Sequence, residues 1–274
     1  IHKGLAPGRL ARDRTPADLQ LAYEEVVLPT ANGKSLAGWL VPPAGASSIC
    51  TKIPAVTLIH GWGGNAATML PLVRPLHEAG FAVLLFDARC HGDSDGDSFT
   101  SLPRFAEDLD HVLHWLEQRP EIDGSRHLIV GHSVGAGAAL LVASRRTDVA
   151  GVVSLAAFSH PEAMMRRWLQ GRHIPHVPIG WMILRYVERT IGHRFADIAP
   201  VNTIRDVCCP VLIVHGAEDE TVPVTEAEQI FAAAPNGKAQ LRVVPGSHDD
   251  FGDEVAMQPE VAAVARFLKS CIDG

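Results

Sequence analysis

The chain has 274 residues, with 24 lysines and arginines against 31 aspartates and glutamates, and a formal net charge of −7. A composition of 47% hydrophobic and 20% charged residues is typical of a globular protein and excludes wholesale disorder, collagen and coiled coil. The acidic balance and the lack of a lysine and arginine cluster argue against a nucleic-acid partner. Five irregularly spaced cysteines do not form a disulfide framework, so we expect reduced thiols and a cytoplasmic protein.

The first part of the chain is predicted to precede the main domain. Residues 1–22 are polar and basic and are expected to form a surface arm, followed by one domain over residues 23–274. Two short apolar-rich runs, 23–28 and 35–41, flank the dipeptide Asn32-Gly33, which is a strong signal for a β-hairpin. No run of 18 apolar residues is present. Because the chain starts at Ile1, the sequence leaves open a signal segment or membrane anchor upstream.

The pattern then changes to continuous apolar runs separated by helix-like stretches. Continuous runs suit strands that are buried on both faces of a parallel sheet. The runs cover 55–59, 81–86, 127–130, 151–155, 211–214 and 241–244, and the helix-like stretches cover 66–79, 102–118, 134–145, 224–233 and 253–271. This alternation predicts an α/β fold with a mostly parallel, doubly wound sheet, opened by the antiparallel N-terminal hairpin.

One long stretch, residues 156–210, interrupts the alternation. A bare loop of that size is uncommon in a compact domain, so we expect a small helical cap inserted over the sheet at about residues 158–207. Apolar residues recur there at helical spacing, as Ile179, Met182, Ile183, Tyr186, Val187, Thr190 and Ile191, and as Met164, Met165, Trp168 and Leu169. The cap is expected to supply an apolar substrate-binding surface that includes Met164, Met165, Trp168, Met182 and Tyr186.

A candidate nucleophile follows the third continuous run. Residues 131–135 read Gly-His-Ser-Val-Gly, which is G-x-S-x-G in the strand–turn–helix context that gives this motif its meaning. The tight turn requires glycine on both sides and forces Ser133 into a strained conformation above the end of the strand. Ser133 is therefore the predicted nucleophile, and the amide of Val134 is predicted to face a developing oxyanion.

A serine hydroxyl needs a base, and the base needs an acid that orients it. His248 follows the last predicted strand and is the predicted base. The acid is expected in the loop after the 211–214 run, where Asp219 stands between Glu218 and Glu220, and residue patterns alone do not separate the three. The order Ser133, Asp219, His248 is the nucleophile, acid, histidine order of the α/β hydrolases.

With these motifs, the sequence resembles the serine hydrolases of the α/β-hydrolase superfamily, and in particular their small bacterial-type carboxylesterases, from about Tyr23 to Leu268. Residues 60–64 (HGWGG) look like the family's HG-x-x-G oxyanion loop, which implies that Trp62 gives a second oxyanion amide. Residues 87–94 are similar to its D-x-R-G-H-G-x-S segment, with Cys90 where glycine is usual. Residues 215–223 look like its acid loop, and this likeness selects Asp219.

The expected reaction is acyl transfer to water, on carboxylic esters with short to medium acyl chains and with no metal or organic cofactor. A thioesterase, an amidase or aminopeptidase, a lipase and an acyltransferase would use the same triad and stay open. A non-catalytic ligand-binding protein on a hydrolase scaffold is the alternative of another class, which the complete set of triad and oxyanion residues disfavours. The partner is expected to be a small-molecule ester; a homodimer is left open.

Overall fold

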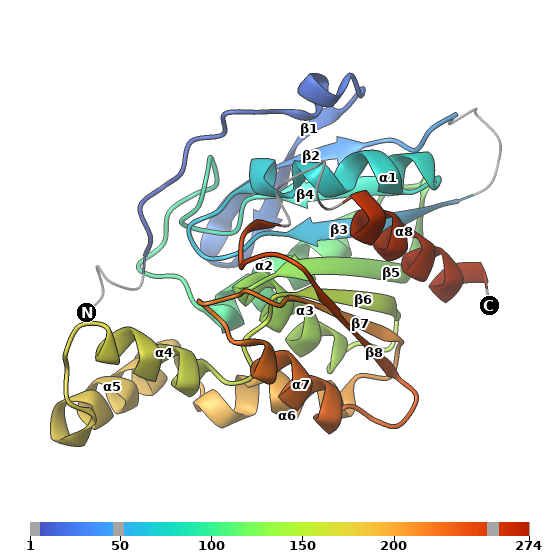
Figure 1. Cartoon of the computed structure of the whole chain (residues 1–274). Coiled ribbons are helices and arrows are strands. Elements are labelled where there is room, and N and C mark those ends of the chain that lie inside the picture. Colours follow the sequence, from blue (N-terminus) through green and yellow to red (C-terminus); the bar gives the residue numbers. More distant parts are fainter. Residues whose placement is uncertain (1–5, 46–51, 251–257, 274) are drawn as a thin grey trace.

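The computed structural model describes residues 6–45, 52–250 and 258–273 and contains one eight-stranded sheet (Figure 1). The spatial order is β1-β2-β4-β3-β5-β6-β7-β8, and only the β1–β2 and β2–β4 pairs are antiparallel. The strands are β1 (Glu24–Thr30), β2 (Lys34–Val41), β3 (Ile53–Ile59), β4 (Ala82–Phe86), β5 (Ile122–His132), β6 (Val149–Leu155), β7 (Val211–Gly216) and β8 (Ala239–Val244). The predicted α/β fold, including its antiparallel N-terminal strands, is confirmed.

The N-terminal hairpin forms where the sequence predicts it. Thr30 pairs with Lys34, so a three-residue turn joins β1 and β2. Within this turn Asn32 and Gly33 have φ angles of +59° and +65°. These are the two residue types that adopt left-handed backbone at low cost, which is why Asn-Gly closes the hairpin here.

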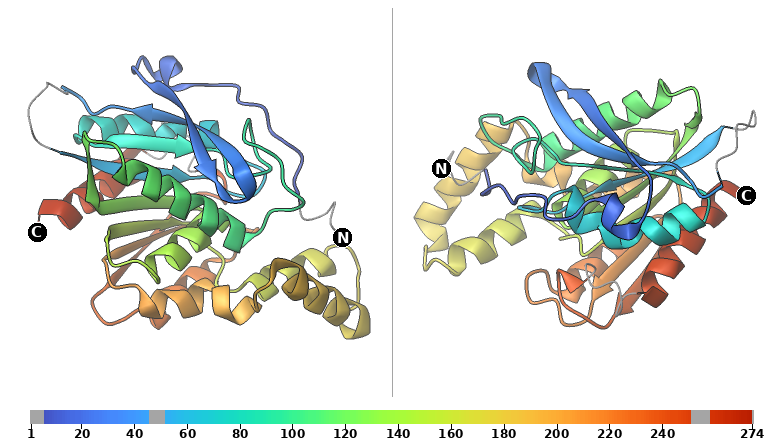
Figure 2. Two further views of the ribbon diagram at one scale, coloured as in Figure 1. Left: turned by 180° about the vertical axis from the view of Figure 1, so that it is seen from behind. Right: turned by 90° about the horizontal axis from the view of Figure 1, so that it is seen from above.

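Helices cover both faces of the sheet (Figures 1 and 2). They are α1 (Val73–Glu78), α2 (Leu102–Glu117), α3 (Val134–Ala143), α7 (Val224–Ala233) and α8 (Gln258–Asp273). One apolar core cluster joins α2, α3 and α7 to one face of the strands, and a second joins α1 and α8 to the other face. Alternate residues of one strand enter different clusters: Leu84 of β4 is in the first, and Val83 and Leu85 are in the second.

Two predicted helices differ in detail from the structure. The stretch 66–79 divides into a 3₁₀ helix, Ala66–Leu72, and the short helix α1, because Pro71 has no N–H and interrupts the α-helical hydrogen bonds. The last predicted helix, 253–271, is found as α8 from Gln258, and residues 253–257 lie outside the described residues.

The long stretch between β6 and β7, which we call the insertion (residues 158–207), is helical. It contains α4 (Pro161–Gln170), a π-helical turn (His176–Gly180), α5 (Trp181–Ile191), α6 (Pro200–Thr203) and the 3₁₀ turns Phe195–Ile198 and Ile204–Asp206. Both Figures 1 and 2 show α4 and α5 together, projecting from the body of the protein. A small apolar cluster of Leu169, Leu184, Val187 and Phe195 holds the two helices together.

The predicted apolar stripe of the insertion is only partly correct. Val187 is buried, and Ile183 and Ile191 pack against the same cluster, but Leu184 lies at its centre instead of Met182 or Tyr186. Met182 and Tyr186 are 61% and 39% exposed. Compared with the predicted orientation, α5 is rotated about its axis so that positions 184, 187 and 191, which are also at helical spacing, face inward.

Residues 6–22 run along the main domain as an arm that ends in a 3₁₀ turn, Pro16–Leu19 (Figure 1). The arm is attached by polar contacts. The Arg12 guanidinium forms an ion pair of 2.9 Å with the buried Asp87 and lies 4.3 Å from the ring centroid of Trp39. Leu19 is also buried. Among the described residues, no helix is long and apolar enough to cross a membrane.

Candidate active site

Ser133 lies at the sharp turn between β5 and α3, with φ of +52° and ψ of −115°. The turn requires glycine on both sides. A Cβ at position 131 would overlap the carbonyl of Gly135, and a Cβ at position 135 would lie 2.6 Å from the carbonyl oxygen of Ile59. A hydrogen bond of 2.8 Å from the Ser133 amide to the Leu155 carbonyl holds the serine in this conformation.

The structure brings His248 and Asp219 to this serine. The Oγ of Ser133 lies 3.1 Å from Nε2 of His248, and Nδ1 of His248 lies 2.7 Å from Oδ2 of Asp219. Ser133 and Asp219 are buried, and the His248 side chain is 12% exposed. When the Nδ1–H of His248 donates a hydrogen bond to the carboxylate, Nε2 carries no proton and can accept a hydrogen bond from the serine hydroxyl.

Asp219 is the one acid of its loop that contacts the histidine. Its Oδ1 accepts hydrogen bonds from the amides of Thr221 (2.9 Å) and Val222 (2.7 Å), so the carboxylate is fixed in orientation. Glu218 and Glu220 are exposed, and Glu218 accepts a hydrogen bond from the Gly246 amide. Of the three acids, Asp219 is therefore the one that lies against His248, and its role as the catalytic acid stays a prediction.

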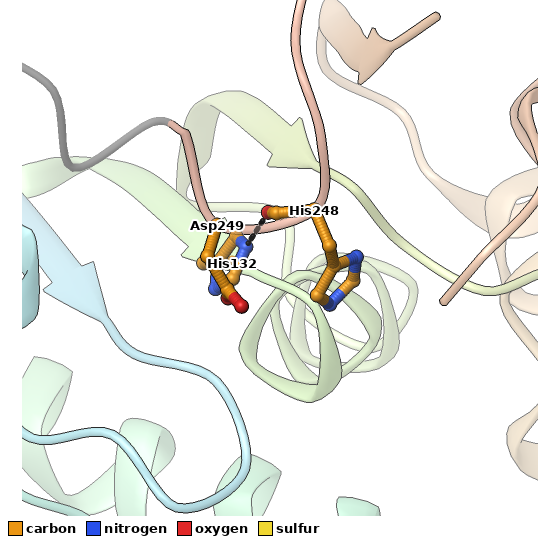
Figure 3. A group of neighbouring side chains, drawn as sticks. All are labelled: His132, His248 and Asp249. Atoms are coloured by element: carbon orange, nitrogen blue, oxygen red, sulfur yellow. Dashed lines mark hydrogen bonds between the residues drawn. The ribbon is translucent and has the colours of Figure 1, made fainter. Parts of the chain in front are cut away.

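His132, the residue before Ser133, supports the histidine loop, a role that the sequence analysis did not assign. Its Nε2–H donates to the backbone carbonyl of His248 over 2.9 Å (Figure 3). Burial lowers the pKa of His132, so the ring is neutral at neutral pH. Position 132 within the serine motif was the only available signal, because a hydrogen bond to a residue 116 positions away leaves no trace in the sequence.

The loop that carries Trp62 lies against the serine. A Cβ at Gly61 would be 3.2 Å from the Cβ of Ser133, which shows how closely the two backbones approach. The Trp62 side chain is 44% exposed. Val134 is the first residue of α3, so its N–H has no acceptor within the helix and is free to face an anion above the turn.

The neutral imidazole ring of His60 holds the start of this loop in place. Its Nδ1–H donates to the Gly61 carbonyl over 2.7 Å, and its Nε2 accepts the amide of Ala88 over 3.0 Å. A protonated ring would place N–H against N–H at Ala88. Complete burial lowers the pKa of His60 to about 3, and the nearby His91 adds to this shift.

The segment similar to D-x-R-G-H-G-x-S has a structural role. Asp87 is fully buried, and Arg89 forms a buried ion pair with Asp108 at 2.6 Å. Cys90 has a φ of +68°, so the turn forms with cysteine in a left-handed conformation that glycine adopts without strain. The Cys90 sulfur accepts a hydrogen bond of 3.2 Å from the Asp97 amide, and this bond stabilises the turn.

Two groups among the described residues each bring together three side chains of the kinds that can bind a metal ion. In the first, His132, His248 and Asp249 (Figure 3), both ring nitrogens of His248 are used by Asp219 and Ser133. In the second, Glu117, His127 and Asp148, the guanidinium of Arg146 pairs with both carboxylates. Existing hydrogen bonds and ion pairs therefore occupy ligand atoms in both groups.

The five predicted substrate-binding residues do not share one buried surface. Met164 packs against the main core, whereas Met165 packs against the small cluster of the insertion. Trp168 is 46% exposed, with the Arg172 guanidinium 3.6 Å from its ring centroid, and Met182 and Tyr186 are exposed as described above. Their role in substrate binding stays a prediction.

Comparison with known proteins places the chain among hydrolases. Residues 52–189 match the family model described as "Serine aminopeptidase, S33". The uncharacterized protein Rv2307c of Mycobacterium tuberculosis is 30% identical over 90% of this chain and 79% of its own length. The uncharacterized protein YfhR of Escherichia coli K12 is 25% identical over 84% of this chain and 75% of its own length.

Solved structures share the fold. The Pyrococcus furiosus esterase Pf2001 superposes with a TM-score of 0.77 at 24% identity, covering 98% of both chains. Est1E of Butyrivibrio proteoclasticus, in a structure with bound ferulic acid, superposes with a TM-score of 0.70 at 21% identity, covering 91% of this chain and all of that one. Taken with its eight-stranded sheet and its G-x-S-x-G turn, the chain belongs to the serine aminopeptidase S33 family of the α/β-hydrolase superfamily.

Proposed function

We propose that the protein is a serine esterase that hydrolyses carboxylic esters with short to medium acyl chains. The observation that carries this proposal is the hydrogen-bonded series from Ser133 Oγ through His248 to Asp219, with distances of 3.1 and 2.7 Å. In this arrangement the histidine accepts the serine proton and the buried carboxylate stabilises the imidazolium that results.

The reaction has two symmetrical halves. Ser133 attacks the ester carbonyl while His248 takes its proton, and the amides of Trp62 and Val134 stabilise the oxyanion of the tetrahedral intermediate. His248 then protonates the leaving alcohol, which departs and leaves an acyl-enzyme. Water attacks this acyl group with His248 again as base, and the collapse of the second intermediate returns the proton to Ser133. Each oxyanion donor contributes about 3–4 kcal/mol in such sites.

An ester is proposed over an aminopeptidase substrate because of the partners of two buried carboxylates, Asp219 and Glu226. An aminopeptidase must bind a substrate ammonium, and both of these carboxylates already have partners. Asp219 is bonded to His248, and Glu226 pairs with Arg167 and accepts the Ser159 amide. We include in the proposal that the insertion acts as a cap over the acyl group.

A fluorophosphonate probe and a substrate panel test the proposal. Folded wild-type protein should be labelled at Ser133, and the Ser133→Ala variant should not be labelled. A p-nitrophenyl ester series from acetate to palmitate, with an anilide and a thioester of the preferred acyl group, should give the highest kcat/KM for a short or medium ester. Absence of labelling in folded wild-type protein would remove the serine mechanism, and a faster anilide would make the protein an amidase.

A further inference from the structure

The outer part of the insertion differs in charge from the rest of the chain. Residues 158–195 contain six arginines and two glutamates, with no lysine or aspartate, although the chain as a whole carries a formal charge of −7. The same segment holds most of the large apolar side chains that are exposed in the described structure. They are Trp168, Val177, Ile179, Trp181, Met182 and Tyr186.

Helix α5 concentrates these features on its outward face. Trp181, Arg185 and Arg189 follow one another at four-residue spacing, and Met182 and Tyr186 lie beside them on the same side of the helix. Trp181 is 55% exposed, and both arginines are exposed. The opposite face, with Leu184 and Val187, packs into the insertion, so the outward face is not needed to hold the helix in place.

A hollow of about 410 Å³ lies at the C-terminal end of α5, lined by Arg185, Glu188, Arg189, Gly192, His193 and Arg194. Glu188 is the only carboxylate in this lining, and both of its oxygens are used. One pairs with Arg185 at 3.0 Å, and the other accepts the Phe195 amide at 2.9 Å. Within the described residues, Arg189 and Arg194 have no ion pair, so two guanidinium groups remain available beside the apolar face.

We propose that the outward face of α5, with its arginine-lined hollow, docks on an anionic phospholipid surface. Exposed tryptophan, tyrosine and methionine bury apolar surface at the boundary between headgroups and acyl chains, and arginines pair with lipid phosphates. A second copy of the chain fits this face poorly. A twofold dimer would set the arginines of one α5 against those of the other.

Docking also goes beyond the proposed hydrolysis, because it needs no reaction at Ser133. Figures 1 and 2 show α5 in the part of the insertion that projects from the body of the protein. Measurements of vesicle binding therefore test the proposal independently of any hydrolytic activity.

Co-sedimentation with lipid vesicles tests the proposal on the full chain. We expect binding to vesicles of phosphatidylcholine with about one-third phosphatidylglycerol, weaker binding to phosphatidylcholine alone, and loss of the difference in high salt. Arg189→Gln should lower the partition coefficient for the anionic vesicles about fivefold, the effect of one cation near a charged surface. Trp181→Ser should lower it for both kinds of vesicle.

Matched variants elsewhere on the surface provide the controls. Arg266→Gln on α8 removes an exposed arginine, and Phe231→Ser on α7 removes an exposed aromatic ring; neither should change vesicle binding. Circular dichroism and thermal unfolding establish that each variant is folded. The proposal is overturned if wild-type protein stays in the supernatant with anionic vesicles, if the control variants lose as much binding as the α5 variants, or if Trp181→Ser instead abolishes a dimer in solution.

Discussion

Replacing Asp219 by asparagine should disable the base without disturbing the fold. The two backbone amides of Thr221 and Val222 donate to Oδ1 at 2.9 and 2.7 Å, so an asparagine must place its carbonyl oxygen there. Its NH₂ group then faces Nδ1 of His248, which must become an acceptor. The imidazole proton then lies on Nε2, which faces Ser133, so Nε2 can no longer accept the proton of the serine hydroxyl.

The structure also sets the size of this effect. Turning the amide around would restore the correct tautomer but leave the buried Val222 N–H and the partly buried Thr221 N–H without acceptors, at about 1–3 kcal/mol each. Taking about 4 kcal/mol for the pair, Asp219→Asn should lower kcat by about 10³ in a p-nitrophenyl ester assay, at unchanged thermal stability to within a few degrees. The exposed Glu220→Gln is the matched control and should stay within about twofold of wild type.

A specific result would refute this reasoning. If Asp219→Asn keeps more than a tenth of the wild-type kcat, the orientation of His248 does not depend on this carboxylate. If Glu220→Gln is the crippled variant instead, the acid lies at a different position, and the loop must rearrange before it is active.

Three further perturbations follow from the same structure. Burial lowers the pKa of several histidines in the folded state, so below the ordinary histidine pKa of about 6.5 the unfolded chain binds more protons than the folded one. The free energy of unfolding should therefore fall as the pH is lowered from 7.5 to 5. His60 alone should account for about 2 kcal/mol of this loss at pH 5, and urea denaturation at the two pH values measures it. The histidines with lowered pKa are His60, His91, His127, His132 and His160. Because Cys90 is left-handed, Cys90→Gly should be about 1 kcal/mol more stable than Cys90→Ala, the reverse of the usual order, and equal or inverted midpoints would argue against strain at this turn. Arg12→Gln removes the cation paired with fully buried Asp87 and should cost about 3 kcal/mol of unfolding free energy, whereas an unchanged midpoint would mean that the arm contributes nothing to stability.

The inner part of the sheet was predictable because its strands are buried on both faces. A strand covered by helices on either side is apolar at nearly every position: the run 211–214 is apolar throughout, and 55–59 is interrupted only by the buried Thr57. The last strand, β8, lies at the edge of the sheet and is partly exposed. The turn at Ser133 was predictable for a related reason. Only glycine fits at positions 131 and 135, so the steric requirement of the turn is visible in the sequence as two glycines that flank the serine motif.

The insertion was less predictable because its helix α5 is apolar in too many directions. Trp181, Met182, Leu184, Tyr186 and Val187 cover most of the circumference, so the 3.6-residue period is satisfied by more than one choice of inner face. The choice is made by the partners, Leu169 and Phe195, which approach from other elements. Helix periodicity carries no information about that approach, and the sequence alone therefore predicts a stripe that includes Met182 and Tyr186.

The hydrogen bonds around the site give a reason why two motifs occur together although only one supplies the proposed nucleophile. The loop that carries Trp62 is fixed at both ends by the segment after β4. At its start, His60 accepts the Ala88 amide at 3.0 Å, and at its end Asp87 accepts the Ala66 amide at 2.7 Å. An oxyanion donor lowers the barrier only if it is already in place when charge develops, since a mobile amide would spend its interaction energy on ordering. In the proposed mechanism the 87–94 segment thus gives no group to the triad, yet it sets how rigidly the Trp62 amide would be held toward the tetrahedral intermediate.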